Sequence, residues 1–226
     1  TAPTPATPAP AAPPDDRAVR WQRYASRLTQ PDAPCDSNYG VILSVAWPSQ
    51  NSRLAWLAEL LRIEPEFAER ISKEGPAQLF AAVYGPRNYG RGTDTSDLWR
   101  LALTVSCTDH ELCRSLAGLY ASIDPNARTE LYCGPLPGRS GGDFPVDLAA
   151  LTERPRSHPH GTCARYRACL ARLDRPVASC DGFEKSAARC ADEPDCEKAL
   201  ACFDAEPRNP KKPLWSDAPG PSGSFY

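Results

Sequence analysis

The central part of the chain alternates between short apolar runs rich in β-branched residues and longer runs with apolar residues on one helical face. Two longer runs, residues 52–73 with a break at Pro65 and residues 108–123, have the spacing of amphipathic helices. The short runs predict four strands, at residues 39–47, 77–84, 98–106 and 128–133. The order βαββαβ predicts an α+β fold, a ferredoxin-like sandwich with both helices on one face of an antiparallel sheet. The alternative is an all-α fold, because short apolar runs do not distinguish a buried helix from a strand.

The same pattern divides the chain into five segments with different composition. The two ends are rich in Pro and Ala or in Pro and Gly, and such sequences bury too little apolar surface to fold alone. We expect a tail with a short helix at 1–34, an α+β domain at 35–135, a linker at 136–160, a cysteine-rich helical module at 161–206 and a Pro-rich tail at 207–226.

The ten cysteines indicate where the protein resides. No two are spaced as CxxC, the arrangement that zinc knuckles and haem attachment use. The chain contains no Met and begins with Thr1, which predicts that a leader has been removed. An even number of widely spaced cysteines then predicts disulfides in an oxidising compartment: a bacterial periplasm or cell surface, with a mitochondrial intermembrane space or a plastid lumen as alternatives. The cysteines expected to be bonded are Cys35, Cys107, Cys113, Cys133, Cys163, Cys169, Cys180, Cys190, Cys196 and Cys202.

The expected element order suggests two pairings in the first domain. The first and last strands of the predicted sheet are neighbours, which favours Cys35–Cys133, and Cys107–Cys113 would close a loop at a helix start. The last six cysteines leave two schemes open. A helical hairpin would give 169–190, 163–196 and 180–202, whereas local pairing would give 169–180, 190–196 and 163–202.

Two segments resemble known families. The CX9C spacing of Cys180 and Cys190 resembles half of a coiled-coil-helix-coiled-coil-helix protein, and residues 163–202 also resemble cysteine-rich helical modules of myxobacterial envelope proteins. Both resemblances imply an oxidising compartment and a structural role. The element order of residues 35–135 resembles the sporulation-related repeat domain, which implies a peptidoglycan-binding fold.

The sequence contains few groups typical of catalysis or metal binding. Cys107, His110 and Cys113 could offer two sulfurs and an imidazole to a metal, and a helix-capping disulfide with a surface His is the alternative. The segment 138–143 contains GxSxG with Ser140, but Pro-rich flanks replace the strand and helix that a nucleophile elbow needs. The remaining candidates are His158 and His160, expected to be solvated loop residues, and Glu66 and Glu69, expected to be acids at a helix start.

The sequence also predicts a binding surface. If Trp99, Leu101, Leu103 and Val105 face the helices, the opposite sheet face carries Phe80, Tyr84 and Arg100. Aromatic anchors outside the predicted core also suit partner binding; these are Trp21, Tyr24, Trp215, Phe225 and Tyr226.

These observations predict a non-catalytic, disulfide-stabilised accessory subunit of a larger extracytoplasmic, membrane-associated assembly. It would bind other protein subunits through its tails and its sheet face. The net charge of −2 and the lack of a basic stripe argue against nucleic acid, no apolar run is long enough to span a membrane, and no cofactor is expected. The alternatives are an envelope module that binds peptidoglycan or another glycan, and a metal protein or enzyme centred on His110.

Overall fold

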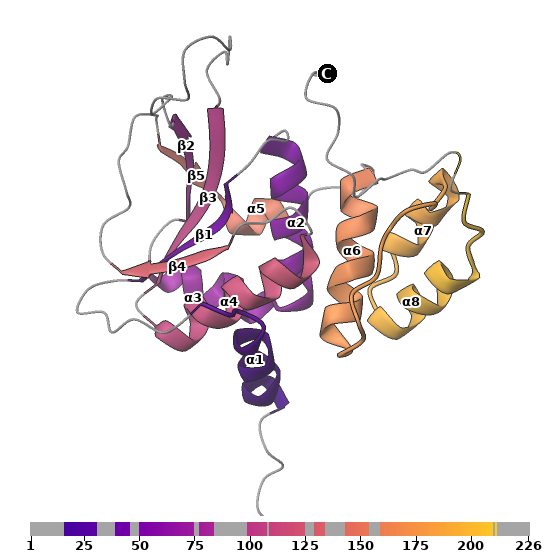
Figure 1. Cartoon of the computed structure of the whole chain (residues 1–226), viewed down its shortest axis with the longest axis horizontal. Coiled ribbons are helices and arrows are strands. Elements are labelled where there is room, and N and C mark those ends of the chain that lie inside the picture. The colour runs from indigo at the N-terminus through magenta and orange to yellow at the C-terminus, as the bar shows by residue number, and fades with distance from the viewer. Residues whose placement is uncertain are drawn as a thin grey trace, which may run out of the picture.

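The computed structural model places a β-sheet against a layer of helices, with a disulfide-rich helical module beyond them (Figure 1). It describes residues 16–30, 39–45, 50–74, 77–83, 99–107, 109–124, 129–133, 143–153, 159–209 and 211. Within these residues, no helix is both long enough and apolar enough to cross a membrane.

The sheet has five antiparallel strands in the order β4-β1-β3-β2-β5. Their bounds are β1 Tyr39–Val45, β2 Ala77–Val83, β3 Trp99–Cys107, β4 Glu130–Cys133 and β5 Asp143–Val146. Val41 lies opposite Val105 on β3 and opposite Leu131 on β4, and all three are buried. Because residues alternate between faces along a strand, these residues mark the face that packs on the helices.

Four helices pack against or beside that face (Figure 1). They are α2 Gln50–Ile63, α3 Pro65–Glu74, α4 His110–Ile123 and α5 Leu148–Thr152. Helix α4 begins where the sequence allows a cap, since the Asp109 carboxylate accepts a hydrogen bond from the backbone N–H of Leu112. Its apolar residues then recur at helical spacing and are buried: Leu112, Leu116, Leu119, Tyr120 and Ile123.

Helix α1, Asp16–Ser26, crosses α4 at Gly118. A Cβ placed on Gly118 would lie 1.9 Å from the carbonyl oxygen of Tyr24, so only glycine allows this close approach. Trp21 and Tyr24 are therefore core residues, with 2% and 0% of their surface exposed. The expectation that they are partner-binding anchors is wrong, because the aromatic face of α1 is buried against α3 and α4 within the same chain.

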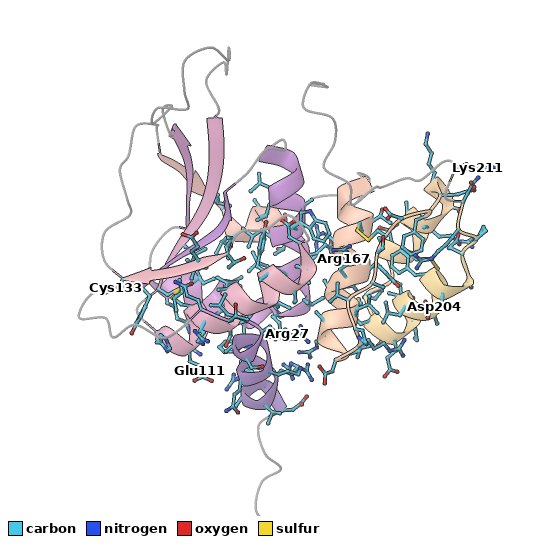
Figure 2. The ribbon with its side chains drawn as sticks, in the orientation of Figure 1. Arg27, Glu111, Cys133, Arg167, Asp204 and Lys211 are labelled. Carbon is cyan, nitrogen blue, oxygen red and sulfur yellow. A yellow bond between two sulfur atoms is a disulfide. The ribbon has the colours of Figure 1, made fainter. Side chains whose placement is uncertain are left out.

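The C-terminal module consists of α6 Pro159–Arg172, the 3₁₀ helix η1 Lys185–Ala187, α7 Ala188–Ala191 and α8 Cys196–Ala205. One side of α6 packs on α2 and α4, and the other side packs on α7 and α8. Figure 2 shows the side chains that fill both interfaces, including Arg167 on the α2 side. The module is centred on Tyr166, Phe183 and Phe203, whose ring centroids lie 5.1 to 5.3 Å apart.

The three disulfides of this module follow neither pairing scheme expected from the sequence. They join Cys163 to Cys180, Cys169 to Cys196, and Cys190 to Cys202. Both schemes treated the segment as regular helices joined by turns. The chain instead leaves α6 in an extended segment, residues 175–180, which runs back along the helix and brings Cys180 beside Cys163.

The expected fold class is also wrong. The described chain is mostly helical, with eight α-helices, and is not a four-stranded βαββαβ sandwich with an appended module. Residues 39–45, 77–83, 99–107 and 130–133 are strands, but β5 extends the sheet and the helix α1 joins the core. The segment 136–160, predicted to be a linker, contains β5 and α5, and α6 contacts α2. Strand β5 contains Pro145, and edge strands tolerate proline, which made this short strand resemble a linker.

Candidate functional site

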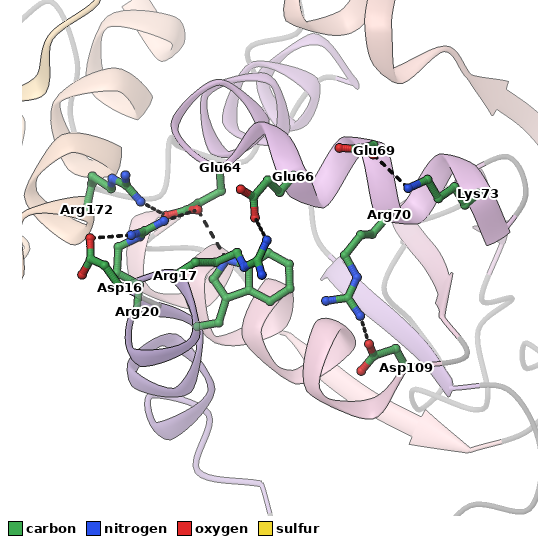
Figure 3. Close-up of polar contacts among 11 residues, drawn as sticks. Asp16, Arg17, Arg20, Glu64, Glu66, Glu69, Arg70, Lys73, Asp109 and Arg172 are labelled. Atoms are coloured by element: carbon green, nitrogen blue, oxygen red, sulfur yellow. Dashed lines mark hydrogen bonds and ion pairs between the residues drawn. The ribbon is translucent and has the colours of Figure 1, made fainter. Parts of the chain in front are cut away.

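A charged groove lies between α1 and α3 (Figure 3). Its volume is about 470 Å³. Five charged side chains line it: Arg17, Glu66, Glu69, Arg70 and Lys73. Arg17 comes from α1 and the other four come from α3, so the packing of α1 creates the groove.

The lining charges are organised in three ion pairs. The guanidinium of Arg17 lies 3.0 Å from the Glu66 carboxylate, and the Lys73 ammonium lies 2.8 Å from Glu69. Arg70 pairs with Asp109, the residue that caps α4. Each of the two acidic side chains that line the groove is therefore paired with a basic one. Because the Glu66 and Glu69 pairs are exposed, they contribute little to stability, and their side chains can exchange partners at little cost.

An aromatic side chain beneath the groove orients two of the arginines. The guanidinium carbons of Arg17 and Arg70 lie 6.0 Å and 5.1 Å from the centre of the Trp21 ring. Trp21 in turn packs on Phe67, with ring centroids 4.5 Å apart. Cation–π contact of this kind holds a guanidinium plane in place while leaving its N–H groups directed outward.

Glu64, between α2 and α3, is a buried carboxylate next to this groove. It accepts hydrogen bonds from Tyr24 at 2.9 Å, from Arg20 at 3.0 Å and from the Trp21 indole at 3.4 Å. Arg172, at the end of α6, donates to the same carboxylate (Figure 3). Glu64 thus joins α1, the α2–α3 junction and α6. Burial, together with the negative charge of Glu64, raises the pKa of Tyr24 to about 12.

The chemistry of the groove suits recognition by charge. The hydrogen bond and the positive charge of Lys73 hold the pKa of Glu69 below its usual value, so Glu69 stays ionised near neutral pH. A general acid or base works best when its pKa lies near the working pH, and the pKa of Glu69 is shifted away from that pH. The paired charges can instead bind a polar segment that carries both signs.

The start of α4 carries the predicted disulfide rather than the metal site that was weighed as its alternative. Cys107 is bonded to Cys113, which confirms the disulfide expected as one of two alternatives. Sulfurs joined in a disulfide do not ligate a metal. The His110 ring lies against Tyr39, with centroids 4.9 Å apart. Cys133 is disulfide-bonded, and Cys35, its expected partner, lies outside the described residues.

The other predicted site residues are spread over the molecule. Phe80 pairs in register with Ala102, and Arg100 pairs with Ala82. His160 lies in the first turn of α6. The residues outside the described part of the chain are Tyr84, Ser140, His158, Trp215, Phe225 and Tyr226.

Glu64 is not among the site residues predicted from the sequence. Its one local signal is an acidic residue directly before Pro65, at the break between two helices. Its partners Arg20 and Arg172 are separated from it by 44 and 108 positions. Comparison of the chain with protein-family models, with curated proteins and with solved structures finds no match, so the residues themselves carry the functional argument.

Proposed function

We propose that this protein is a non-catalytic accessory subunit of a larger extracytoplasmic, membrane-associated protein assembly. The protein is disulfide-stabilised, and its disulfides indicate an oxidising compartment. In that compartment the protein binds other protein subunits through its uncovered sheet face and its tails.

One observation carries the proposal. The helices α2, α4 and α5 lie on the same side of the sheet (Figure 1). Val105 and Cys107 face them and are buried, so the alternate register positions of β3 lie on the opposite face. Arg100 occupies such a position, and Phe80 on β2 shares the face through its pairing with Ala102. No described element covers that face, and aromatic and arginine residues are enriched in protein interfaces.

Site-specific photocrosslinking tests the face. A photoreactive amino acid replaces Phe80, and in a control it replaces Val177, an exposed residue of the C-terminal module. In extracts of the source organism, we expect a discrete protein adduct from position 80 and none from position 177. The same adducts from both positions would refute a specific interface.

Native gel migration tests the assembly itself. We expect the chain to migrate in a band far above its own mass of 24.6 kDa after extraction with gentle detergent. Trp215→Ala, in the C-terminal tail, should weaken this association without changing the melting temperature. Migration as an isolated small protein would overturn the proposal.

A further inference from the structure

The groove between α1 and α3 carries more positive than negative charge. Three basic side chains, Arg17, Arg70 and Lys73, line it beside two acidic ones. Each acidic side chain is paired with a basic one, whereas Arg70 pairs with Asp109, which lies outside the lining (Figure 3). The whole chain has a net charge of −2, so the excess of positive charge is local to the groove.

The carboxylates that pair with the two arginines are stabilised independently of them. Glu66 lies in the first turn of α3, where the positive end of the helix dipole favours an acid. Asp109 caps α4, and its carboxylate also accepts a hydrogen bond from the backbone N–H of Leu112 at 3.1 Å. Both carboxylates are partly exposed to water. Arg17 and Arg70 can therefore turn to another anion without leaving a buried, unsupported carboxylate behind.

Both guanidiniums are accessible and lie near one aromatic ring. The Arg17 and Arg70 side chains are 46% and 40% exposed. Their guanidinium carbons lie 6.0 Å and 5.1 Å from the centre of the Trp21 ring, which is buried. Trp21 packs on Phe67 and donates a hydrogen bond from its indole to Glu64. Because the ring that supports both arginines is fixed in the core, one ligand can reach both of them.

We propose that this groove binds an acidic segment of a partner protein, with carboxylates of the segment on Arg17 and Arg70. Arginine suits this role because its planar fork of N–H donors matches a carboxylate while its plane rests on an aromatic ring. When Arg17 turns to the ligand, Glu66 can pair with a basic side chain of the same segment. A segment with acidic residues next to a basic one therefore matches the charges of the groove.

The length of the lining favours a segment over a single small ion. Glu66 and Lys73 are seven positions apart on α3, and Arg17 adds a contact from α1. With a rise of 1.5 Å per residue, the α3 side of the groove is about 10 Å long. An extended chain covers that distance with about three residues. A small anion would contact only one of the two arginine positions fully.

Fluorescence anisotropy of a dye-labelled peptide tests the groove on the full, oxidised chain. The probe peptide contains Glu-Glu-Lys between glycines, and the control peptide contains Gln-Gln-Lys. We expect the probe to bind and the control to bind at least about tenfold more weakly, because hydrogen bonds between charged groups are the stronger ones. Binding of the probe should also weaken as salt is added, since the contacts are exposed.

Matched variants locate the contact. Arg70→Gln removes the guanidinium and leaves Asp109 on its backbone hydrogen bond, so it should weaken probe binding at least about tenfold. Arg70→Lys keeps the charge but loses the planar fork, and it should show an intermediate loss. Lys198→Gln removes one exposed positive charge on α8, away from the groove, and should leave the affinity unchanged.

Four results would each overturn the proposal. They are that the probe does not bind, that both peptides bind equally, that Arg70→Gln and Lys198→Gln bind the probe equally, or that inorganic phosphate displaces the probe at an equal concentration. The comparison of the two peptides uses the wild type, so it decides the matter even if a variant fails to fold. Crosslinking from Phe80 does not involve this groove, so failure here is distinguishable from failure of the sheet-face interface.

Discussion

The buried carboxylate of Glu64 offers a sharp test of how the three parts of the fold are joined. In Glu64→Gln the shape of the side chain is kept and one negative charge is lost. The amide oxygen still accepts a hydrogen bond from Tyr24, whereas the amide NH2 replaces the carboxylate oxygen that accepts from Arg20 and Trp21. The positive charges of Arg20 and Arg172 remain, and the side chains of these two residues are 13% and 31% exposed.

The magnitude follows from this exposure. Removing one partner of a fully buried ion pair costs about 3–5 kcal/mol, because the other charge stays buried without compensation. Arg20 keeps Asp16 as a partner and Arg172 is partly solvated, so the lower end, about 3 kcal/mol, applies. For a chain of this length, this corresponds to a fall in melting temperature of about 6–12 °C.

Glu66→Gln is the matched control. It makes the same chemical change two positions along, in a pair whose side chains are 46% and 42% exposed. The expected loss is no more than about 1 kcal/mol, and high salt should abolish it. The assay is urea unfolding of the oxidised protein at low and high salt. If Glu64→Gln costs no more than Glu66→Gln, or if salt removes its effect equally, the buried junction does not stabilise the fold as argued.

Three further predictions concern the core and the disulfides. The pKa of Tyr24 is about 10 in the unfolded chain and about 12 in the folded protein, so the unfolded chain binds fewer protons between these pH values. Stability should therefore fall by at most about 3 kcal/mol from pH 10 to 12, and Tyr24→Phe should lose that part of the alkaline decline in unfolding titrations. Gly118→Ala should destabilise by about 1–3 kcal/mol although alanine favours helices, because the new Cβ meets the Tyr24 carbonyl; an increased melting temperature would show that α1 does not cross there. Removing the bond between Cys169 and Cys196 with a double alanine variant should cost about 3.6 kcal/mol, since its loop spans 27 positions, and an unchanged urea midpoint would contradict that pairing.

Local sequence patterns located several elements because the information lies within a few neighbouring residues. The apolar spacing of residues 108–123 predicted α4, and the apolar runs around Val41 and Val105 predicted strands that are present. The even cysteine count and its spacing predicted disulfides, and the six-residue separation of Cys107 and Cys113 allowed one pairing to be proposed correctly. The acidic start of the helix at Glu66 could also be predicted from neighbouring residues, whereas its ion-pair partner Arg17 lies far away in the chain and could not.

The tertiary structure decided everything that depends on residues far apart in the chain. The role of α1 was misjudged because amphipathic periodicity shows that a helix has an apolar face but does not show what covers it. The pairing of the last six cysteines depends on the extended segment after α6, which has no periodic signal. Glu64 is an ordinary acidic residue until Arg20, Tyr24 and Arg172 converge on it. Burial and charge pairing are properties of the folded arrangement, so the overall fold and the groove at α1 could be read only from the structure.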